Sequence, residues 1–243
     1  MSEPLTSRIR PLNLSDFVGQ VHLVAPGKPL HQAIEKQHLF SFILWGPPGV
    51  GKTTLARIYA HALGADCYEL SAVSAGKADV KKIIDTTSEQ PKILFLDEIH
   101  RFNKAQQDSF LPLMEDGTLV LVGATTENPS FELNAAVLSR AQVLVLERLW
   151  DDELELLAQR AETEAGHVLP LDAGARNALL EMADGDGRSL LNLIEQILAW
   201  GLEVSIDQIT LSQRLMRRAA VYDKSGDSHY NLISALHLSL IHI

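Results

Sequence analysis

A glycine-rich loop between an apolar run and a helical segment could bind phosphate. Residues 42–45 read FILW and residues 46–53 read GPPGVGKT, which satisfies the P-loop pattern GxxxxGK(S/T). The glycines allow a tight turn that brings backbone N–H groups close to an anion, and a helix beginning near Lys52 adds its positive N-terminal end. We expect Lys52 to reach the β- and γ-phosphates of a nucleotide and Thr53 to ligate Mg²⁺. The predicted phosphate-loop contacts are Gly46, Pro47, Pro48, Gly49, Val50, Gly51, Lys52, Thr53 and Thr54.

Two adjacent carboxylates follow a second apolar run. Residues 92–96 read KILFL, and Asp97 and Glu98 come directly after them. Because the carboxyl ends of parallel strands meet at one edge of a sheet, this Walker B-type pair would lie beside the glycine-rich loop. We assign Asp97 to the metal ion and Glu98 to the attacking water, whose proton a carboxylate can accept. A solvated acidic turn is the alternative, but the upstream loop favours a site that hydrolyses a nucleotide.

Length and composition indicate a soluble globular protein with one large domain or two small ones. The chain has 243 residues, 46% of them hydrophobic, with neither a membrane-span-length apolar run nor a secretory signal at its start. We therefore expect cytosolic residence and no membrane partner. The formal net charge of −10 argues against nucleic acid covering the whole surface but permits local basic patches. Cys67 is the only cysteine, which excludes an internal disulfide and predicts a small packed side chain.

The elements that must position these groups alternate between strands and helices. Strands are expected at 40–45, 67–70, 92–96, 118–126 and 142–146, with helices at 53–63, 79–89 and 104–115 and a helical turn at 135–139. This alternation predicts a parallel sheet covered by helices on both faces. Beyond residue 150 the periodicity becomes helical, over 151–166, 172–183, 188–200 and 208–218, which predicts a small helical domain.

These motifs together resemble a known family. GPPGVGKTTLA, the strand ending in DEIHR and the strand ending in GATTENPSF are similar to the AAA+ ATPase core. RFNKAQQDSFLPLMEDGTL and GATTENPSFELN resemble one group within it, the replication-associated recombination protein A family (RarA or MgsA), a relative of the clamp loaders. The resemblance covers roughly residues 8 to 237 and implies a five-stranded sheet of order 5-1-4-3-2, a helical lid and a C-terminal domain that forms tetramers.

The resemblance also divides the chain. We expect an α/β nucleotide-binding core with an N-terminal arm over 1–149, a helical lid over 150–222, and the start of an oligomerisation domain over 223–243. The final LSLIHI does not follow the family pattern, so we expect that last domain to be truncated and assembly to be affected.

Four residues gain roles from the resemblance alone. Thr126, with Asn128 as its rival, resembles the sensor-1 residue that reads the γ-phosphate. Arg140 resembles an arginine finger that reaches the nucleotide of a neighbouring subunit and offsets transition-state charge. Arg188 resembles the sensor-2 arginine of the lid. Surface arginines without a catalytic role are the alternative.

Other residues have weaker assignments. Val18 and Gly19 resemble the residues that border the adenine, although a packing role is nearly as well supported. His100 is expected to be structural, because a lone histidine without further ligands does not indicate a metal site. Two basic patches could contact DNA or could be solvated helix faces. They comprise Lys77, Lys81 and Lys82, and Arg214, Arg217 and Arg218.

The function that the resemblance implies is a DNA-stimulated ATPase that uses ATP and Mg²⁺ in fork maintenance, repair and recombination at stalled or gapped forks. Its expected partners are single- or double-stranded DNA, single-stranded-DNA-binding protein and further copies of the chain, near the nucleoid. A Holliday-junction branch-migration motor is one alternative, since LFLDEIHR and GATT also occur there, but no hairpin-forming insertion or winged-helix module is evident. A clamp-loader-type nucleotide switch is another, against which Glu98 and Arg140 speak. A small-molecule kinase is least favoured, because no acceptor segment or arginine-rich lid is present.

Overall fold

Five parallel strands form one sheet in the computed structural model, which describes residues 3–71 and 77–222. The strands are β1 (Phe42–Trp45), β2 (Asp66–Ser71), β3 (Lys92–Asp97), β4 (Val120–Thr125) and β5 (Gln142–Val145). Their spatial order is β2-β3-β4-β1-β5, which confirms the expected order read from the opposite edge. Trp45 is paired with Thr125 on one side and Val145 on the other, so the carboxyl ends of three strands lie level. This edge is where the functional loops begin.

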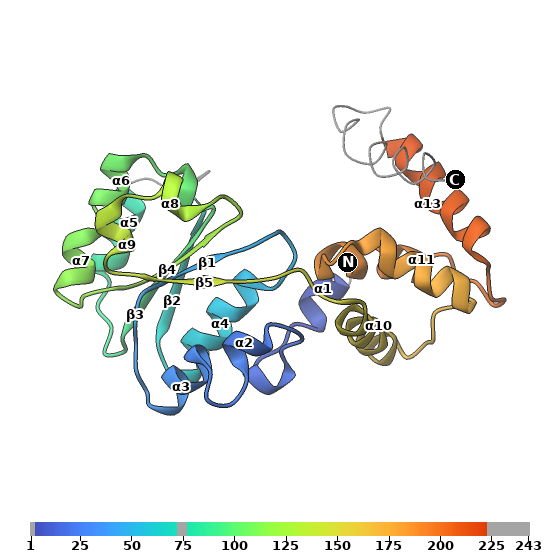
Figure 1. Ribbon diagram of the computed structural model, residues 1–243, viewed down its shortest axis with the longest axis horizontal. Helices are drawn as coiled ribbons and strands as arrows, with labels where there is room; N and C mark the ends of the chain where they lie inside the picture. Colours follow the sequence, from blue (N-terminus) through green and yellow to red (C-terminus); the bar gives the residue numbers. More distant parts are fainter. Residues whose placement is uncertain (1–2, 72–76, 223–243) are drawn as a thin grey trace.

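Alternate residues of each strand supply two separate apolar layers. Phe42 and Leu44 pack with α2 (Val21–Val24), α3 (Pro29–Glu35) and α4 (Lys52–Ala62) on one face (Figure 1). Ile43 packs on the other face. The helices there are α5 (Lys77–Asp85), α6 (Lys104–Asp108), α7 (Leu111–Glu115), α8 (Pro129–Glu132) and α9 (Ala135–Leu138). Because the side chains of a strand alternate between faces, an apolar run such as FILW is explained by burial on both sides.

An aromatic cluster holds β1 against α4, the two elements that flank the glycine-rich loop. The rings of Phe42 and Tyr59 lie edge to face with centroids 5.0 Å apart. The Tyr59 hydroxyl donates to the His38 carbonyl at 3.1 Å and accepts from the Phe40 amide at 3.0 Å. Burial raises the pKa of Tyr59 to about 12, so the hydroxyl stays neutral and the cluster is stable at ordinary pH.

Four longer helices form a second, helical unit. These are α10 (Asp151–Ala165), α11 (Ala173–Ala183), α12 (Gly187–Leu198) and α13 (Gln208–Tyr222). The first helix of the chain, α1 (Leu5–Arg8), packs on this unit, where Leu5 is 1% exposed and its amide donates to Glu195 at 3.1 Å (Figure 1). The apolar surface that buries Leu5 is therefore that of the helical unit.

Other sequence expectations need correction or fall outside the described residues. The helix expected over 104–115 is divided into α6 and α7. Pro112 explains the break, since it has no N–H to bond the carbonyl four residues earlier, that of Asp108 at the end of α6, and its ring crowds that carbonyl. The domain expected over 223–243 lies outside the described part of the chain.

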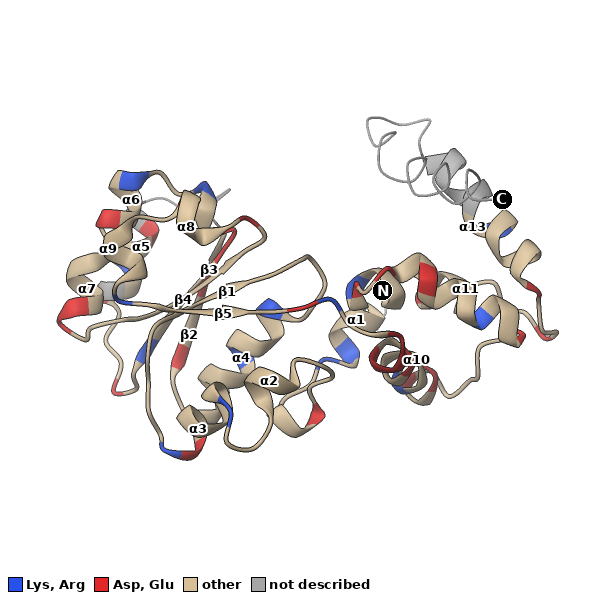
Figure 2. Ribbon diagram, in the orientation of Figure 1, with Lys and Arg blue, Asp and Glu red and all other residues tan. Residues whose placement is uncertain are grey.

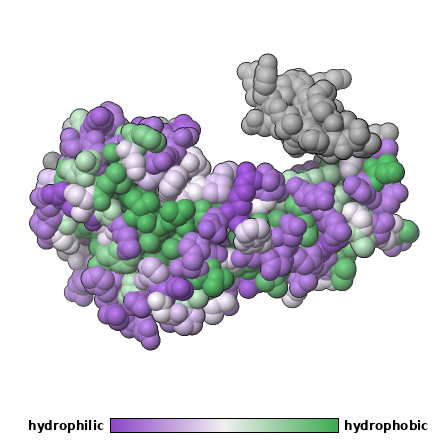
Figure 3. Space-filling view, viewed as in Figure 1, coloured by the Kyte–Doolittle hydropathy of each residue, from purple (hydrophilic) through white to green (hydrophobic). Residues whose placement is uncertain are grey.

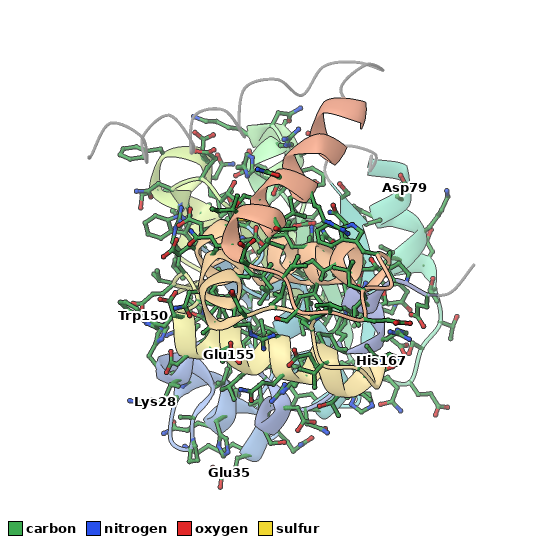
Figure 4. The ribbon with its side chains drawn as sticks, turned by 90° about the vertical axis from the view of Figure 1, so that its right-hand side faces the viewer. Lys28, Glu35, Asp79, Trp150, Glu155 and His167 are labelled. Carbon is green, nitrogen blue, oxygen red and sulfur yellow. The ribbon has the colours of Figure 1, made fainter. Side chains whose placement is uncertain are left out.

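Charged and apolar side chains are distributed differently over the surface. Lysine and arginine are interspersed with aspartate and glutamate over both units in Figure 2. In Figure 3, apolar side chains gather over the α/β part near the edge strand β5, where Val145 is 45% exposed. Trp150, labelled in Figure 4, projects from the start of α10 and is 68% exposed.

Within the described residues, no helix is both long and apolar enough to cross a membrane. Cys67 is partly buried at the edge of the core, and burial raises the pKa of its thiol to about 11.

Candidate active site

The glycine-rich loop connects β1 to α4 in a conformation that strongly favours glycine at two positions. Gly49 has φ +68° and Gly51 has φ +96°. A methyl group at Gly51 would lie 2.6 Å from the ring of Phe17, so both the backbone angle and the surroundings require glycine. The N-terminal turn of α4 follows directly, and its first amides have no carbonyl partner within the helix. The loop therefore presents backbone N–H groups to an anion.

Lys52 lies inside the loop that it follows. Its residue is 9% exposed, and its ammonium group donates to the carbonyl of Gly46 at 2.7 Å and to that of Pro47 at 2.6 Å. Burial lowers the pKa of Lys52, although the nearby carboxylates of Asp97 and Glu98 act in the opposite direction. The side chain is thus a desolvated cation held next to two acidic groups.

The acidic pair lies at the end of β3, as the spacing predicts. Asp97 is the last residue of the strand, and Glu98 adopts the left-handed conformation at φ +55°. Few residues other than glycine adopt this conformation, which costs free energy and occurs often at functional sites. The Glu98 amide donates to the Asp97 carboxylate at 3.1 Å, and the Glu98 carboxylate lies 3.3 Å from the Nε2 atom of His100. His100, expected to be only structural, contacts the residue assigned to the attacking water.

A cavity of about 380 Å³ connects these groups. Its size lies within the usual range for small-molecule sites. Among the sequence-predicted residues, those that line it are Val18, Pro48, Gly49, Val50, Gly51, Lys52, Thr53, Thr54, Asp97, Glu98, Thr126 and Arg188. The structure therefore brings most of the candidate site residues to one cavity at the carboxyl edge of the sheet.

Sequence reasoning missed the wall of the cavity that the arm and the helical unit provide. Its apolar members are Ile9, Pro11, Phe17, Leu149, Leu157 and Leu191, and two of its basic members are Arg10 and Arg160. Arg160 also donates a hydrogen bond to the Asp16 carbonyl and so joins α10 to the arm. The leucines are spaced as in any core helix, so the sequence holds no signal that separates them from ordinary packing residues.

The start of α12 lies against the glycine-rich loop. Asp186 caps this helix by accepting a hydrogen bond from the Ser189 amide at 2.8 Å. The same carboxylate lies so close to Gly49 that a methyl group there would be 1.7 Å from its Oδ1 atom. Arg188 follows in the first turn and lines the cavity, close enough to Lys52 to help lower its pKa. The helical unit thus contributes both charge and contact surface to the site.

The two rivals for the sensor-1 role have different surroundings. Thr126 follows β4 and lines the cavity. The side-chain oxygen of Asn128 accepts from the Ser130 amide at 3.0 Å and caps α8. The Asn128 side chain is therefore occupied in local structure, whereas Thr126 borders the cavity.

Arg140 and Gly19 do not line the cavity. Arg140 follows α9 on the surface, where it pairs with Glu115 and donates to the Ala136 carbonyl at 2.9 Å. Gly19 has φ +80°, and a methyl group there would lie 2.7 Å from a side-chain carbon of Leu149. Close packing against Leu149 therefore requires a glycine here, at the junction of the arm and the helical unit.

The proposed DNA-contacting residues lie on helices. Lys77, Lys81 and Lys82 belong to α5, and the side chain described among them, that of Lys82, pairs with Asp79 at 3.2 Å. Arg214 on α13 lies 5.5 Å from the centroid of the Trp200 ring. The side chains of Arg217 and Arg218 lie outside the described residues.

The residues present fit a magnesium nucleotide. Oxygen ligands from a threonine hydroxyl and a carboxylate suit Mg²⁺, which usually takes few protein ligands together with substrate phosphates. Thr53 and Asp97 offer these oxygens on one cavity, next to the buried Lys52 ammonium and the free amides of α4. The apolar wall opposite them suits a base and sugar. The sheet order, the loop and the acidic pair together define a nucleotide-binding protein of the AAA class.

Comparison with known proteins agrees with this class. Residues 42–149 match the model of the ATPase family associated with various cellular activities, and residues 164–240 match the AAA C-terminal domain. Replication-associated recombination protein A of Haemophilus influenzae and that of Escherichia coli K12 are both 45% identical over 98% of the chain. The ATPase WRNIP1 of Dictyostelium discoideum is 40% identical over 98% of the chain, which covers 30% of that protein. The chain belongs to the AAA ATPases, in the replication-associated recombination protein A family.

Solved structures with a similar fold come from a second group of proteins, and the chain spans only part of each curated relative. The Thermotoga maritima RuvB Holliday junction branch migration motor matches with a TM-score of 0.67 and 27% identity, over 84% of this chain and 71% of that one. A mutant of the same protein reaches a TM-score of 0.72 at 27% identity, over 90% and 76%. The chain spans 56% of the Haemophilus relative and 57% of the Escherichia relative.

Proposed function

We propose that the chain is the ATP-hydrolysing part of a DNA-stimulated ATPase that acts at stalled or gapped replication forks. The observation that carries the proposal is the arrangement of Lys52, Asp97, Glu98 and Thr126 around one cavity beside the glycine-rich loop. The similarity to proteins named for replication-associated recombination supports the choice of DNA as the regulator.

The chemistry assigns one task to each group. Lys52 and the loop amides hold the β- and γ-phosphates, while Thr53 and Asp97 hold Mg²⁺, which neutralises phosphate charge when bound. Glu98 accepts a proton from water as the water oxygen bonds to the γ-phosphorus and the bond to the β–γ bridging oxygen breaks. ADP and inorganic phosphate are the products. Thr126 reads the γ-phosphate, with Asn128 as the weaker candidate.

Movement of the helical unit would couple hydrolysis to DNA. Arg188 lines the cavity from α12, so it can contact a bound nucleotide. ATP would then close this unit, and the loss of γ-phosphate contacts would release it. The unit corresponds to a lid over 150–222 on a core over 1–149, with α1 of the arm attached to the lid. Lys77, Lys81 and Lys82 on α5 form the proposed DNA surface, and alanine at Lys81 and Lys82 should weaken DNA stimulation and its salt dependence.

Assembly belongs to the same proposal. Arg140 lies on the surface outside its own cavity, a position suited to a finger that completes the site of a neighbouring copy. We infer a homo-oligomer, a tetramer in the whole protein, that works with single-stranded-DNA-binding protein in the cytoplasm at the nucleoid.

The decisive experiment measures ATP hydrolysis with and without single-stranded and forked DNA, beside Glu98→Gln. Turnover that rises with DNA and disappears in Glu98→Gln supports the proposal. Tight ATP binding without turnover would favour a nucleotide switch instead.

A branch-migration motor is the second candidate, because the RuvB structures share the fold. The chain is 45% identical to replication-associated recombination protein A but 27% identical to RuvB, which favours the fork-associated function. A four-way junction that stimulates turnover more than a fork or a single strand would reverse this preference.

A further inference from the structure

Two hydrogen bonds and one close imidazole–carboxylate contact connect Glu98 to the turn that follows β4. The Glu127 amide donates to the Thr125 hydroxyl at 3.0 Å. That hydroxyl lies 2.9 Å from the Nδ1 atom of His100, and the Nε2 atom of His100 lies 3.3 Å from the Glu98 carboxylate. The chain thus crosses from β4 to the residue after β3 through one imidazole ring.

The surroundings make this connection specific. Thr125 is fully buried, and the side chains of His100 and Glu98 are 14% and 29% exposed. Hydrogen bonds shielded from water are stronger, and a polar group that loses its partner there is costly. Rotation of the His100 ring would break both of its contacts, so Thr125 fixes the ring and the ring fixes the carboxylate. Arg101 also approaches Glu98, at 3.5 Å, but its side chain is 57% exposed and its contribution is screened by water.

One arrangement of the protons on Thr125 and His100 suits all of these contacts. The Thr125 oxygen accepts from the Glu127 amide, and its hydroxyl proton can point to Nδ1 of His100 at 2.9 Å or to the Glu127 carbonyl at 3.3 Å. When the hydroxyl proton points to Nδ1, the ring carries its own proton on Nε2, which faces the Glu98 carboxylate at 3.3 Å. The opposite neutral tautomer would direct a nitrogen lone pair at the carboxylate, which is repulsive.

We propose that His100 is a positioning residue that orients Glu98 for hydrolysis and connects it to the γ-phosphate-reading turn. The proposal rests on the ATPase function proposed above. Thr126, which borders the cavity, lies between Thr125 and Glu127, the two residues that begin the chain. A shift of Thr126 on contact with the γ-phosphate therefore alters the hydrogen bond that orients His100. The same turn would sense the nucleotide and set the carboxylate.

Kinetics of paired variants test the proposal. His100→Ala and Thr125→Val should each lower kcat at least tenfold, which is part of the roughly 10²- to 10⁴-fold that a general base contributes. Affinity for a fluorescent ATP analogue should stay within about twofold, because neither residue lines the cavity. His100→Gln and Thr125→Ser, which keep a donor and a hydroxyl, should recover part of the rate. His61→Ala, an exposed histidine on α4, is the control. Combining His100→Ala with Thr125→Val should cost no more than the larger single effect.

A second measurement reads the contact without turnover. Nitrogen NMR of histidine-labelled protein, with His100 assigned from His100→Gln, should show a ring protonated at Nε2 that responds to Glu98→Gln. Unchanged kcat in His100→Ala, or a His100 ring that is protonated at Nδ1 and ignores Glu98→Gln, would overturn the positioning role. A wild-type chain without turnover would refute the proposed function instead, and the NMR result would still decide whether His100 holds Glu98.

Discussion

The backbone amide of Gly187 donates a hydrogen bond to the carbonyl of Gly49 at 3.1 Å. Gly187 begins helix α12 of the helical unit, and Gly49 lies in the glycine-rich loop of the α/β unit. The contact uses main-chain atoms, so it does not depend on the side chain of either residue. The hydrogen bond connects the glycine-rich loop directly to the helical unit, which gives a physical basis for coupling between nucleotide and lid.

The first prediction concerns Gly49. Alanine there would need φ +68° and would place its methyl group 1.7 Å from the Asp186 carboxylate. The variant should lose the contact between loop and α12 and should bind a fluorescent ATP analogue at least tenfold more weakly.

Gly27→Ala is the matched control for that change. Gly27 has φ +79°, but no atom lies within 4 Å of its added methyl group. It should cost about 1 kcal/mol of unfolding free energy from the left-handed backbone alone, with unchanged nucleotide affinity. Equal affinity losses in the two variants would mean that backbone strain, not the contact with Asp186, explains the effect.

The second prediction concerns the buried ammonium of Lys52. Burial lowers the pKa of this group below its ordinary value of 10.5, so the folded chain disfavours the charged form. Between the lowered pKa and 10.5 the unfolded state binds more protons, and the stability of the wild type should rise with pH across this window. Lys52→Met should be the more stable chain at pH 7 without nucleotide, and its advantage should shrink as the pH approaches 10.5.

Urea denaturation of both chains at several pH values measures this difference. An advantage of Lys52→Met that grows with pH would contradict the argument. Nucleotide binding should be lost in the same variant, because a methionine cannot contact phosphate.

The sequence could predict the centre of the site because its signals are local. The strand before the loop, the glycine spacing and the carboxylates after KILFL each determine structure within a few residues, and the parallel sheet brings them together. The sheet order came from the family resemblance, since strand spacing alone does not give neighbour relations. The alternation of strands and helices nevertheless predicts both layers correctly.

The wall of the cavity could not be predicted, because it depends on contacts between distant segments. Arg160 and Phe17 reach the site only after the arm has packed against the helical unit. His100 was assigned a structural role because a lone histidine does not indicate a metal site, and its contact with Thr125 forms only when β3 pairs with β4. The division of the helix near Pro112 could have been predicted, since the proline itself is the cause.

The third prediction concerns an ion-pair network in the helical unit. Arg176 on α11 bonds Glu155 at 2.9 Å and Glu162 at 2.7 Å, both on α10, where Figure 4 labels Glu155. Arg176→Gln should lower the unfolding free energy by about 1.5–3 kcal/mol, the range for hydrogen bonds to charged groups. Arg148→Gln, which removes the more exposed pair with Asp184, should cost less than about 1 kcal/mol.

The stabilisation that the Arg176 ion-pair network provides should fall as the pH falls. Hydrogen bonds from Arg176 hold the pKa of Glu155 below its ordinary value of 4.5. The stabilisation is present above 4.5 and is lost as the pH falls through the lowered pKa. The difference between wild type and Arg176→Gln should therefore be largest near pH 7 and should shrink below pH 4.5, as urea denaturation can show. A constant difference down to pH 3 would mean that packing of the arginine stem carries the effect.

The last prediction concerns the finger role of Arg140. Arg140→Ala should lower turnover by about 10³-fold or more if the guanidinium stabilises the transition state of a neighbouring site, while nucleotide affinity stays unchanged. Glu115→Gln is the matched variant, because it removes the ion-pair partner of Arg140 and keeps the guanidinium. Its turnover should equal or exceed that of the wild type, and its stability should fall by less than about 1 kcal/mol.

Mixing two inactive variants shows whether Arg140 acts between subunits. Glu98→Gln keeps the finger but lacks the base, whereas Arg140→Ala keeps the base but lacks the finger. In a mixed assembly, the finger of one chain can complete the site of the other, so turnover should reappear when the two variants are combined at concentrations where the chain self-associates. A single chain cannot achieve this, because its own Arg140 pairs with Glu115 outside the cavity. Mixtures that associate but stay inactive would place Arg140 in a structural role, and recovery of turnover would make assembly a requirement for hydrolysis.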